Sequence, residues 1–241
     1  MTPDLRIYRS GRLRAKAAAL WLVVASGVLP ARAVDETAEV LARMDRAAPT
    51  FKSFSAHVRR VSHTAVINED TVDSGTILLK RSRNEIRMLV ELTEPDPKSY
   101  ALHGDRFEIY YPKMKTIEEY DVGKNRTLVG QLLLIGFGSS GRELAAAYHI
   151  KVLGPDTVAD QKTTHLELIP KAEEVLKHLP KLEIWVPENG IYPVQQKFFQ
   201  PGGDYLQATY TDVKVNPPLS DADLKLKAPK DAKHVSPQKE R

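Results

Sequence analysis

Short runs of alternating apolar and polar residues follow one another through most of the chain from about residue 54 onward. In "SGTILLKR", Ile77 and Leu79 alternate with Thr76 and Lys80, and "NEIRMLVEL" and "DRFEIYYP" repeat the pattern. A period of two is that of a β-strand with one buried face. Turn segments such as "TEPDP" and "HGD" separate the runs. These connections are too short for crossover helices and favour hairpins, so we predict an antiparallel sheet.

Two segments depart from this pattern. "VDETAEVLARMDRAAPTF" places Val40, Leu41 and Met44 on one helical face, with acidic residues in its first turn and Pro49 as its stop. Residues 123–147, "GKNRTLVGQLLLIGFGSSGRELAAA", carry apolar side chains on nearly every side of a would-be helix. In an exposed loop they would leave a large apolar patch in water. We therefore expect both segments to cover the apolar face of the sheet, which gives an α+β, mostly β, fold.

The second segment contains the spacing G-x-G-x-x-G at Gly136, Gly138 and Gly141. In a dinucleotide-binding unit this turn leads into a crossover helix and a parallel strand. Here only Arg142 to Tyr148 separate the last glycine from the next strand pattern. We interpret the three glycines as a hinge that lets the cover bend.

The N-terminus has the pattern of a secretory signal. Several arginines precede the apolar run "AAALWLVVASGVL", which is shorter than the roughly 20 residues that span a bilayer, and "ARA" ends at Ala33. We expect residues 1–33 to be removed and a soluble protein to be released into the periplasm; an uncleaved anchor is the alternative. We further predict a single domain at 34–228 and, from its proline, lysine and aspartate content, a disordered tail at 229–241.

Charge and residue usage exclude several functions. The leader holds six of the 35 basic and one of the 31 acidic residues, which leaves 29 against 30 in the mature chain and no global case for binding nucleic acid. The chain has no cysteine, and its seven histidines are scattered. We therefore expect neither a metal site nor a cofactor nor an enzyme.

The order of motifs resembles that of the LolA-like family of periplasmic outer-membrane lipoprotein carriers. The resemblance rests on "FKSFSAHVRRV", "SGTILLKRSRNEIRMLVELTEP", "ALHGDRFEIYYPKMKTIEEYDV" and "LEIWVPENGIYPVQQKFFQPGGDYLQATYTDVKVN". It implies a curved antiparallel half-barrel, an incomplete β-barrel, with a helical lid over an apolar concave face. The implied function is that of a monomeric carrier of lipoprotein or lipid acyl chains, with an inner-membrane release complex and an outer-membrane acceptor as partners.

The resemblance also implies one functional residue, Arg81, which corresponds to the arginine that latches the lid by hydrogen bonds to lid carbonyls. Ser82 stands where the family has proline. Arg81 shares strand parity with Ile77 and Leu79 and would point to the concave side. We expect the cavity to be lined by Ile77, Leu79, Ile86, Met88, Val90, Phe107, Ile109, Leu166, Leu168, Leu182 and Ile184. The candidate lid residues are Leu128, Leu132, Leu133 and Phe137.

Two other classes remain open. A sensor or regulatory domain of the same fold would bind lipid or a partner peptide in the same groove, as in periplasmic anti-sigma-factor regulators. An exported enzyme would need a convergent set of polar residues, which the sequence does not offer. Residue types alone also leave open whether the helices and the sheet pack as an ordinary core or enclose an openable cavity.

Overall fold

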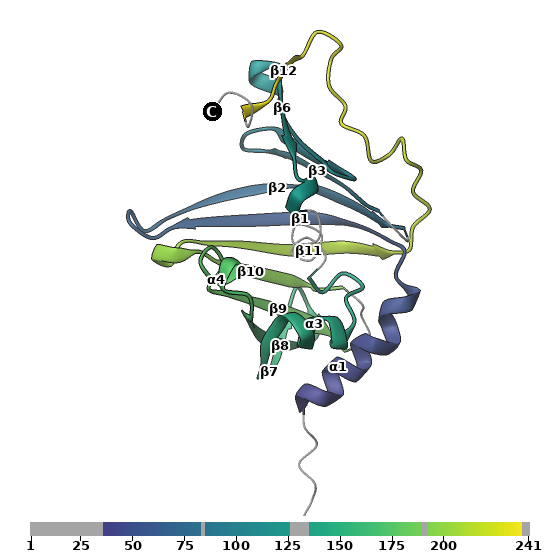
Figure 1. Ribbon diagram of the computed structural model, residues 1–241, viewed down its shortest axis with the longest axis vertical. Coiled ribbons are helices and arrows are strands. Elements are labelled where there is room, and N and C mark those ends of the chain that lie inside the picture. The colour runs from purple at the N-terminus through teal and green to yellow at the C-terminus, as the bar shows by residue number, and fades with distance from the viewer. Residues whose placement is uncertain (1–35, 83–84, 126–134, 189–191, 238–241) are drawn as a thin grey trace, which may run out of the picture. The chain divides into compact units, whose positions relative to one another are not determined.

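The computed structural model describes residues 36–82, 85–125, 135–188 and 192–237, all within one compact unit, Val34–Arg241. The predicted signal peptide 1–33 and three predicted lid residues, Leu128, Leu132 and Leu133, lie outside the described residues. The described chain forms a 12-stranded sheet in the order β12-β6-β5-β4-β3-β2-β1-β11-β10-β9-β8-β7 (Figure 1). All neighbouring strands are antiparallel except β12, which runs parallel to β6. This is the open half-barrel predicted from the sequence.

The strands fall into three groups. The N-terminal wing consists of β2 (Glu69–Arg81), β3 (Ile86–Glu94), β4 (Lys98–His103), β5 (Arg106–Tyr111) and β6 (Thr116–Asp121). The centre consists of β1 (Ser53–Thr64), β11 (Tyr205–Val215) and β10 (Gln195–Phe199). The C-terminal wing consists of β9 (Lys181–Pro187), β8 (Gln161–Pro170) and β7 (Tyr148–Val158), and β12 (Lys233–Val235) lies at the far edge of the N-terminal wing.

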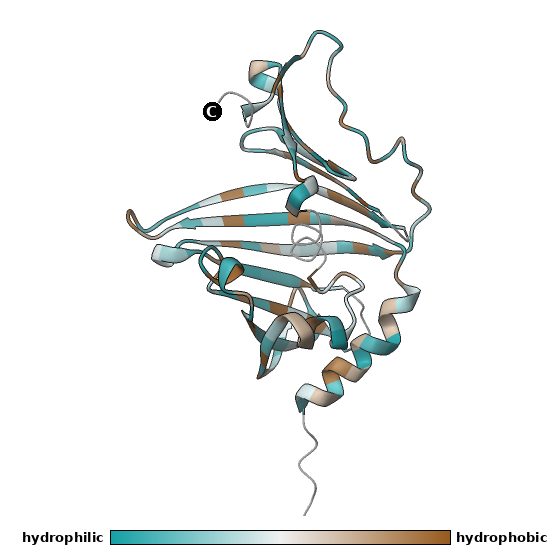
Figure 2. Cartoon of the chain, viewed as in Figure 1, coloured by the Kyte–Doolittle hydropathy of each residue, from teal (hydrophilic) through white to brown (hydrophobic). Residues whose placement is uncertain are grey.

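Cross-strand pairing places the predicted cavity residues on one face, which we call the inner face. Leu79 of β2 pairs with Met88 of β3. Met88 in turn pairs with Leu102 of β4, which pairs with Phe107 of β5. A second row on the same face consists of Ile77, Val90, Tyr100 and Ile109. Figure 2 shows the underlying alternation of apolar and polar residues along the long strands β1 and β2.

Three α-helices of the described chain flank the sheet. Helix α1 (Glu36–Ala47) has Glu36 and Glu39 in its first turn and buries Val40 and Met44, as predicted. Helix α3 (Gly141–Ala147) begins with a capping box in which Ser140 accepts from the Glu143 amide and Glu143 accepts from the Ser140 amide. The short helix α4 (Glu173–Leu176) precedes β9. The 3-10 turns are η1 (Ala48–Thr50), η2 (Pro112–Met114), η3 (Gly123–Asn125) and η4 (Pro201–Gly203).

The C-terminal segment corrects one prediction. We expected 229–241 to be disordered, yet residues 229–237 are part of the fold, and 238–241 lie outside the described residues. Residues 217–237, which we call the strap, run from the end of β11 to β6 (Figure 1). Leu224 is fully buried against Leu89 and Ala101. The segment is ordered because its few apolar residues cover an apolar strip on the outer face of the N-terminal wing.

Ion pairs add to this attachment. Asp221 lies 3.0 Å from the Lys80 ammonium and 2.7 Å from the Arg87 guanidinium, and Lys227 lies 3.7 Å from Glu91. At its end, β12 pairs with the edge strand β6 and satisfies backbone groups that an open edge would leave unpaired. Within the described ranges, no helix has both the length and the apolar character needed to cross a membrane.

Candidate functional site

The predicted cavity residues lie on the inner face in two apolar clusters. In the N-terminal cluster, Ile77, Leu79 and Met88 are buried, and Ile86, Val90 and Phe107 are only partly buried against it. In the C-terminal cluster, the predicted residues are all fully buried: Leu166, Leu168, Leu182 and Ile184. Ile109 shares the inner face through its pairing with Tyr100 but is half-buried and belongs to neither cluster. The sequence suggested one cavity, whereas the structure shows two adjoining regions with different covers.

Helices cover the C-terminal cluster. Val40 and Met44 of α1 and Leu144 of α3 pack directly into it. The two helices approach closely because Gly141 has no side chain: a Cβ there would lie 2.3 Å from the carbonyl oxygen of Leu41. Gly141, predicted as a hinge residue, therefore stands at a tight helix contact.

The segment 135–140, which we call the lid segment, reaches both clusters. Ile135 is 1% exposed in the C-terminal cluster, and Phe137 is 1% exposed in the N-terminal cluster. The Phe137 ring packs edge-on against Phe54, with centroids 4.8 Å apart, and against Tyr210 at 5.3 Å. Such aromatic contacts add about 0.5–1.5 kcal/mol to the burial of the ring. Phe137, one of the candidate lid residues, therefore lies on the inner face; its role in a lid stays a prediction.

Two glycines shape the lid segment. Gly136 and Gly138 have φ angles of +81° and +62°, in the region that disfavours residues with a side chain. A Cβ at Gly138 would also lie 2.6 Å from the Phe51 side chain. Because α3 is only seven residues long and leads into the antiparallel strand β7, the glycine motif does not form the turn of a parallel βαβ unit. Whether these glycines act as a hinge stays a prediction.

Arg81 contacts the lid segment at its backbone. Its Nη1 donates to the Gly138 carbonyl oxygen at 2.6 Å, and its Nη2 lies 3.9 Å from a carboxylate oxygen of Glu143. The Arg81 side chain is 33% exposed. A hydrogen bond from a charged donor contributes about 1.5–3 kcal/mol when shielded, and solvent reduces this contribution here. Arg81 therefore donates to a carbonyl oxygen of the lid segment, and whether this bond acts as a latch stays a prediction.

A second polar contact to the lid segment was not found from the sequence. The Nε2 of Gln196 donates to the Ile135 carbonyl oxygen at 2.6 Å, and its Oε1 accepts from the Tyr210 hydroxyl at 2.7 Å. Both side chains are buried, with residues 3% and 4% exposed. Burial raises the pKa of Tyr210, so its hydroxyl remains a donor. The sequence does carry one signal for it. Gln196 has the same strand parity as Val194 and Phe198, so it is a polar residue at a position where the alternation predicts an apolar one.

The inner face becomes polar toward the β1–β2 turn. Arg60 of β1 pairs with Asp73 of β2 at 2.8 Å, and its guanidinium lies 5.4 Å from the centre of the Tyr100 ring. Burial lowers the pKa of Arg60, but the neighbouring Tyr100 and Asp73 outweigh it and raise the pKa above the usual value. This ion pair bounds the apolar part of the N-terminal wing.

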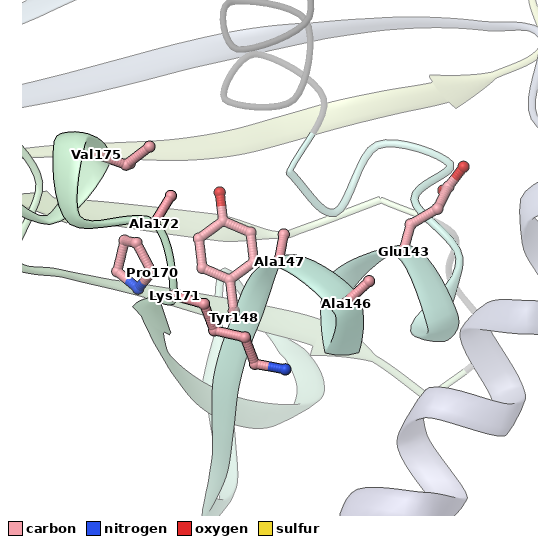
Figure 3. Close-up of a pocket in the computed structure, with 8 residues that line it drawn as sticks. All are labelled: Glu143, Ala146, Ala147, Tyr148, Pro170, Lys171, Ala172 and Val175. Atoms are coloured by element: carbon pink, nitrogen blue, oxygen red, sulfur yellow. The ribbon is translucent and has the colours of Figure 1, made fainter.

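Two depressions are lined in part by residues of α3. One, of about 400 Å³, lies between α3, α4 and the ends of β7 and β8, and the Tyr148 ring stands among its walls (Figure 3). Burial raises the pKa of Tyr148. Its lining is mostly apolar: Glu143, Ala146, Ala147, Tyr148, Pro170, Lys171, Ala172 and Val175. The other, of about 390 Å³, includes Arg81, Gly138 and Phe51. Both volumes are within the range of small-ligand sites.

The described residues hold no group of three or more His, Asp or Glu side chains placed to bind a metal ion. Comparison with known proteins gives structural matches only: no family model and no curated protein matches the chain. An uncharacterized conserved protein from Thermus thermophilus has a similar structure with a TM-score of 0.53 at 14% identity, covering 83% of this chain and 99% of that one.

The crystal structure of MucB is similar with a TM-score of 0.51 at 14% identity; the match covers 80% of this chain but only 63% of MucB. A LolA superfamily protein from Nitrosomonas europaea matches at 16% identity over 79% of this chain and 97% of its own, but its TM-score of 0.39 is too low to support an argument. At these identities the matches show the fold alone. That fold is an open antiparallel half-barrel with helices over its inner face.

Proposed function

We propose that this protein is a periplasmic carrier that shields the acyl chains of a lipid-modified cargo, lipoprotein or lipid, between the inner and outer membranes. The observation that carries the proposal is the place of Phe137. Its ring fills the inner face of the N-terminal cluster, yet it belongs to a short segment tied down by the polar contacts of Arg81 and Gln196. A side chain held in this way can be exchanged for another apolar group.

The energetics suit a carrier that must also release its cargo. Each acyl methylene moved out of water contributes about 0.8 kcal/mol, so a few buried chain segments hold a guest without specific contacts. Burial of Phe137 itself contributes about 1.5–3 kcal/mol to the closed form. A guest has to overcome this contribution and the polar contacts, which lowers its net affinity. Transfer from an inner-membrane release complex to an outer-membrane acceptor requires such a moderate affinity.

Lipid bound by the native protein is the first test. Protein isolated without detergent is analysed by native mass spectrometry, directly and after incubation with vesicles of phosphatidylethanolamine and phosphatidylglycerol. A carrier retains lipid at about one molecule per chain. Protein that contains no lipid in both cases would refute the proposal.

Arg81→Leu tests the latch. Loss of the bond to Gly138 removes about 1 kcal/mol from the closed form after allowance for exposure, so lipid retention rises about fivefold. Arg59→Leu is the matched control, because Arg59 is an exposed arginine on β1 whose side chain points to the outer face, away from the lid segment. Equal retention in the two variants would remove Arg81 from the mechanism.

The sensor alternative is supported by the structural similarity to MucB, a protein that has been solved in complex with MucA. A domain of that kind would use the same inner face to detect lipid or a partner peptide. In both readings we assign a binding role and no enzymatic activity. Transfer of extracted lipid to acceptor vesicles separates the two: a carrier delivers its lipid, whereas a sensor keeps it.

A further inference from the structure

Gln196 is a polar side chain in the middle of the apolar inner face. It pairs with Ile184 of β9 on one side and with Ala208 of β11 on the other. Ile184 belongs to the C-terminal cluster and Ala208 to the N-terminal cluster. Gln196 therefore stands at the seam between the two clusters. A buried amide at such a position lowers stability unless both its ends are hydrogen-bonded.

The direction of this amide is fixed by its neighbours. The Ile135 carbonyl can only accept, so the Gln196 atom that faces it at 2.6 Å must be the nitrogen. The amide oxygen then accepts from the Tyr210 hydroxyl at 2.7 Å. Tyr210 is itself held between Phe54 and Phe137. The inner face thus presents one oriented N–H donor to whatever lies over the seam, and in the closed form that group is a carbonyl oxygen.

Displacement of the lid segment leaves this donor without a partner. An unsatisfied buried donor is costly, and a purely hydrocarbon guest offers nothing in exchange. The acyl chains of a lipid or lipoprotein are joined to their glycerol or amine by ester or amide groups, whose carbonyl oxygen accepts as the Ile135 carbonyl does. A guest that brings this oxygen to the seam restores the bond.

The geometry points to a carbonyl-binding subsite at Gln196, oriented by Tyr210, that takes the ester or amide carbonyl of the bound acyl chain when the Ile135 carbonyl leaves. This inference rests on the proposed function and makes it more specific. The subsite distinguishes acyl lipids from ether lipids and alkanes of equal length, which the apolar walls alone cannot do.

The test is competition between two lipids in one vesicle. Vesicles contain equal amounts of dipalmitoyl phosphatidylglycerol and its dihexadecyl ether analogue, which lacks the two carbonyl oxygens. The full mature protein extracts lipid, and mass spectrometry gives the ratio of ester to ether lipid bound. One neutral hydrogen bond corresponds to about a fivefold preference for the ester. In Gln196→Leu the ratio falls to about one.

Gln195→Leu is the matched control. Gln195 is the neighbouring residue of the same strand, points to the opposite face and bonds to Gln207 and Thr209 there. It should keep the preference of the wild type. Tyr210→Phe retains the packed ring but loses the hydroxyl that orients the amide, so its ratio should lie between the two. This variant keeps the inference testable where Gln196→Leu does not fold.

The outcomes separate the inference from the function on which it rests. A wild-type protein that extracts neither lipid overturns the carrier proposal and this inference with it. A wild-type protein that extracts both lipids equally, a preference that survives in Gln196→Leu, or a preference that is undiminished in Tyr210→Phe overturns the carbonyl subsite alone. A preference lost in Gln196→Leu and kept in Gln195→Leu supports it.

Discussion

The two wings of the sheet are covered on opposite faces. In the C-terminal wing the helices seal the inner face, where Leu168 is fully buried, and Ile169 on the outer face is 38% exposed. In the N-terminal wing the strap covers the outer face over Leu89, and on the inner face Val90 is only partly buried. The C-terminal wing is therefore a closed hydrophobic core. The N-terminal wing is covered on its outer face by the strap, and in the proposed carrier a guest can displace the cover of its inner face.

This difference assigns separate tasks to the two wings. The C-terminal wing supplies rigidity, because its cover consists of regular helices whose side chains pack into a closed cluster. In the proposed carrier the N-terminal cluster supplies the site, because the lid segment covers it with a single ring, that of Phe137. In the proposed carrier, opening the lid segment would expose apolar surface while the C-terminal wing stays folded.

The largest expected effect tests this difference in stability. Leu168→Ala in the C-terminal wing should lower the free energy of unfolding by about 3 kcal/mol, because the fully buried site cannot collapse. Val90→Ala in the N-terminal wing should cost about 1 kcal/mol or less, because the wild-type side chain is only partly buried. Urea unfolding of both variants measures the two values. Equal losses would show that both wings are closed cores.

The next largest loss of stability is expected at the strap. Leu224→Ala should cost about 2 kcal/mol, near the lower end for a buried leucine, because the strap can shift to fill the gap. Hydrogen exchange should show the loss as faster exchange of β12 and β6. Leu176→Ala, at a leucine that is 39% exposed, serves as the control. Unchanged exchange in β12 would mean that its pairing with β6 does not depend on this anchor.

Gly138→Ala sharpens the comparison at the lid segment. The new methyl group meets Phe51, and the positive φ adds about 1–2 kcal/mol of strain. The closed form is weakened, so lipid retention should rise by about tenfold, and the free energy of unfolding should fall by no more than this strain. Gly202→Ala is the control, because its φ of +91° carries the strain without any atom within 4 Å. Equal lipid retention in both variants would contradict a lid that closes on Phe51.

The smallest effect is a pH dependence of the strap. The hydrogen bond from Lys80, aided by Arg87, lowers the pKa of Asp221 from its usual 3.8. A lowered pKa in the folded state means that the contribution is complete above the usual value and is lost as pH falls through the lowered one. The difference in Tm between wild type and Asp221→Asn should therefore be small at pH 6, shrink as the pH falls below the usual 3.8, and vanish once the pH is below the lowered pKa. A difference that persists at low pH would assign it to something other than this carboxylate.

The strands and α1 could be predicted because each carries its own signal. Alternation in "SGTILLKR" fixes which side chains of β2 face inward, and the spacing of Val40 and Met44 fixes the buried side of α1. Arg81 was found through the same parity combined with the family resemblance. These are local patterns, and the fold satisfies them without exception at these positions.

The strap and Gln196 could not be found in this way, because their environment is tertiary. The composition of 217–237 resembles that of a disordered tail, and only the outward-facing Leu78 and Leu89 indicate that something covers that face. Gln196 is a polar residue at an inward-facing position, which contradicts the alternation. Its role becomes visible only in the structure, where Ile135 and Tyr210 are its hydrogen-bond partners. The strap covers apolar residues that face outward, and Gln196 is a polar residue that faces inward. Both depart from the rule that apolar side chains face inward and polar ones outward, and both mark contacts between distant segments.

Spin labelling tests the central claim most directly, because the chain has no cysteine of its own. Labels at Ser139→Cys in the lid segment and Thr71→Cys on β2 report the distance between cover and sheet by pulsed electron resonance. Loading with phosphatidylglycerol from vesicles should lengthen and broaden this distance as Phe137 leaves the inner face. An unchanged distance in protein that native mass spectrometry shows to carry one lipid per chain would contradict the account.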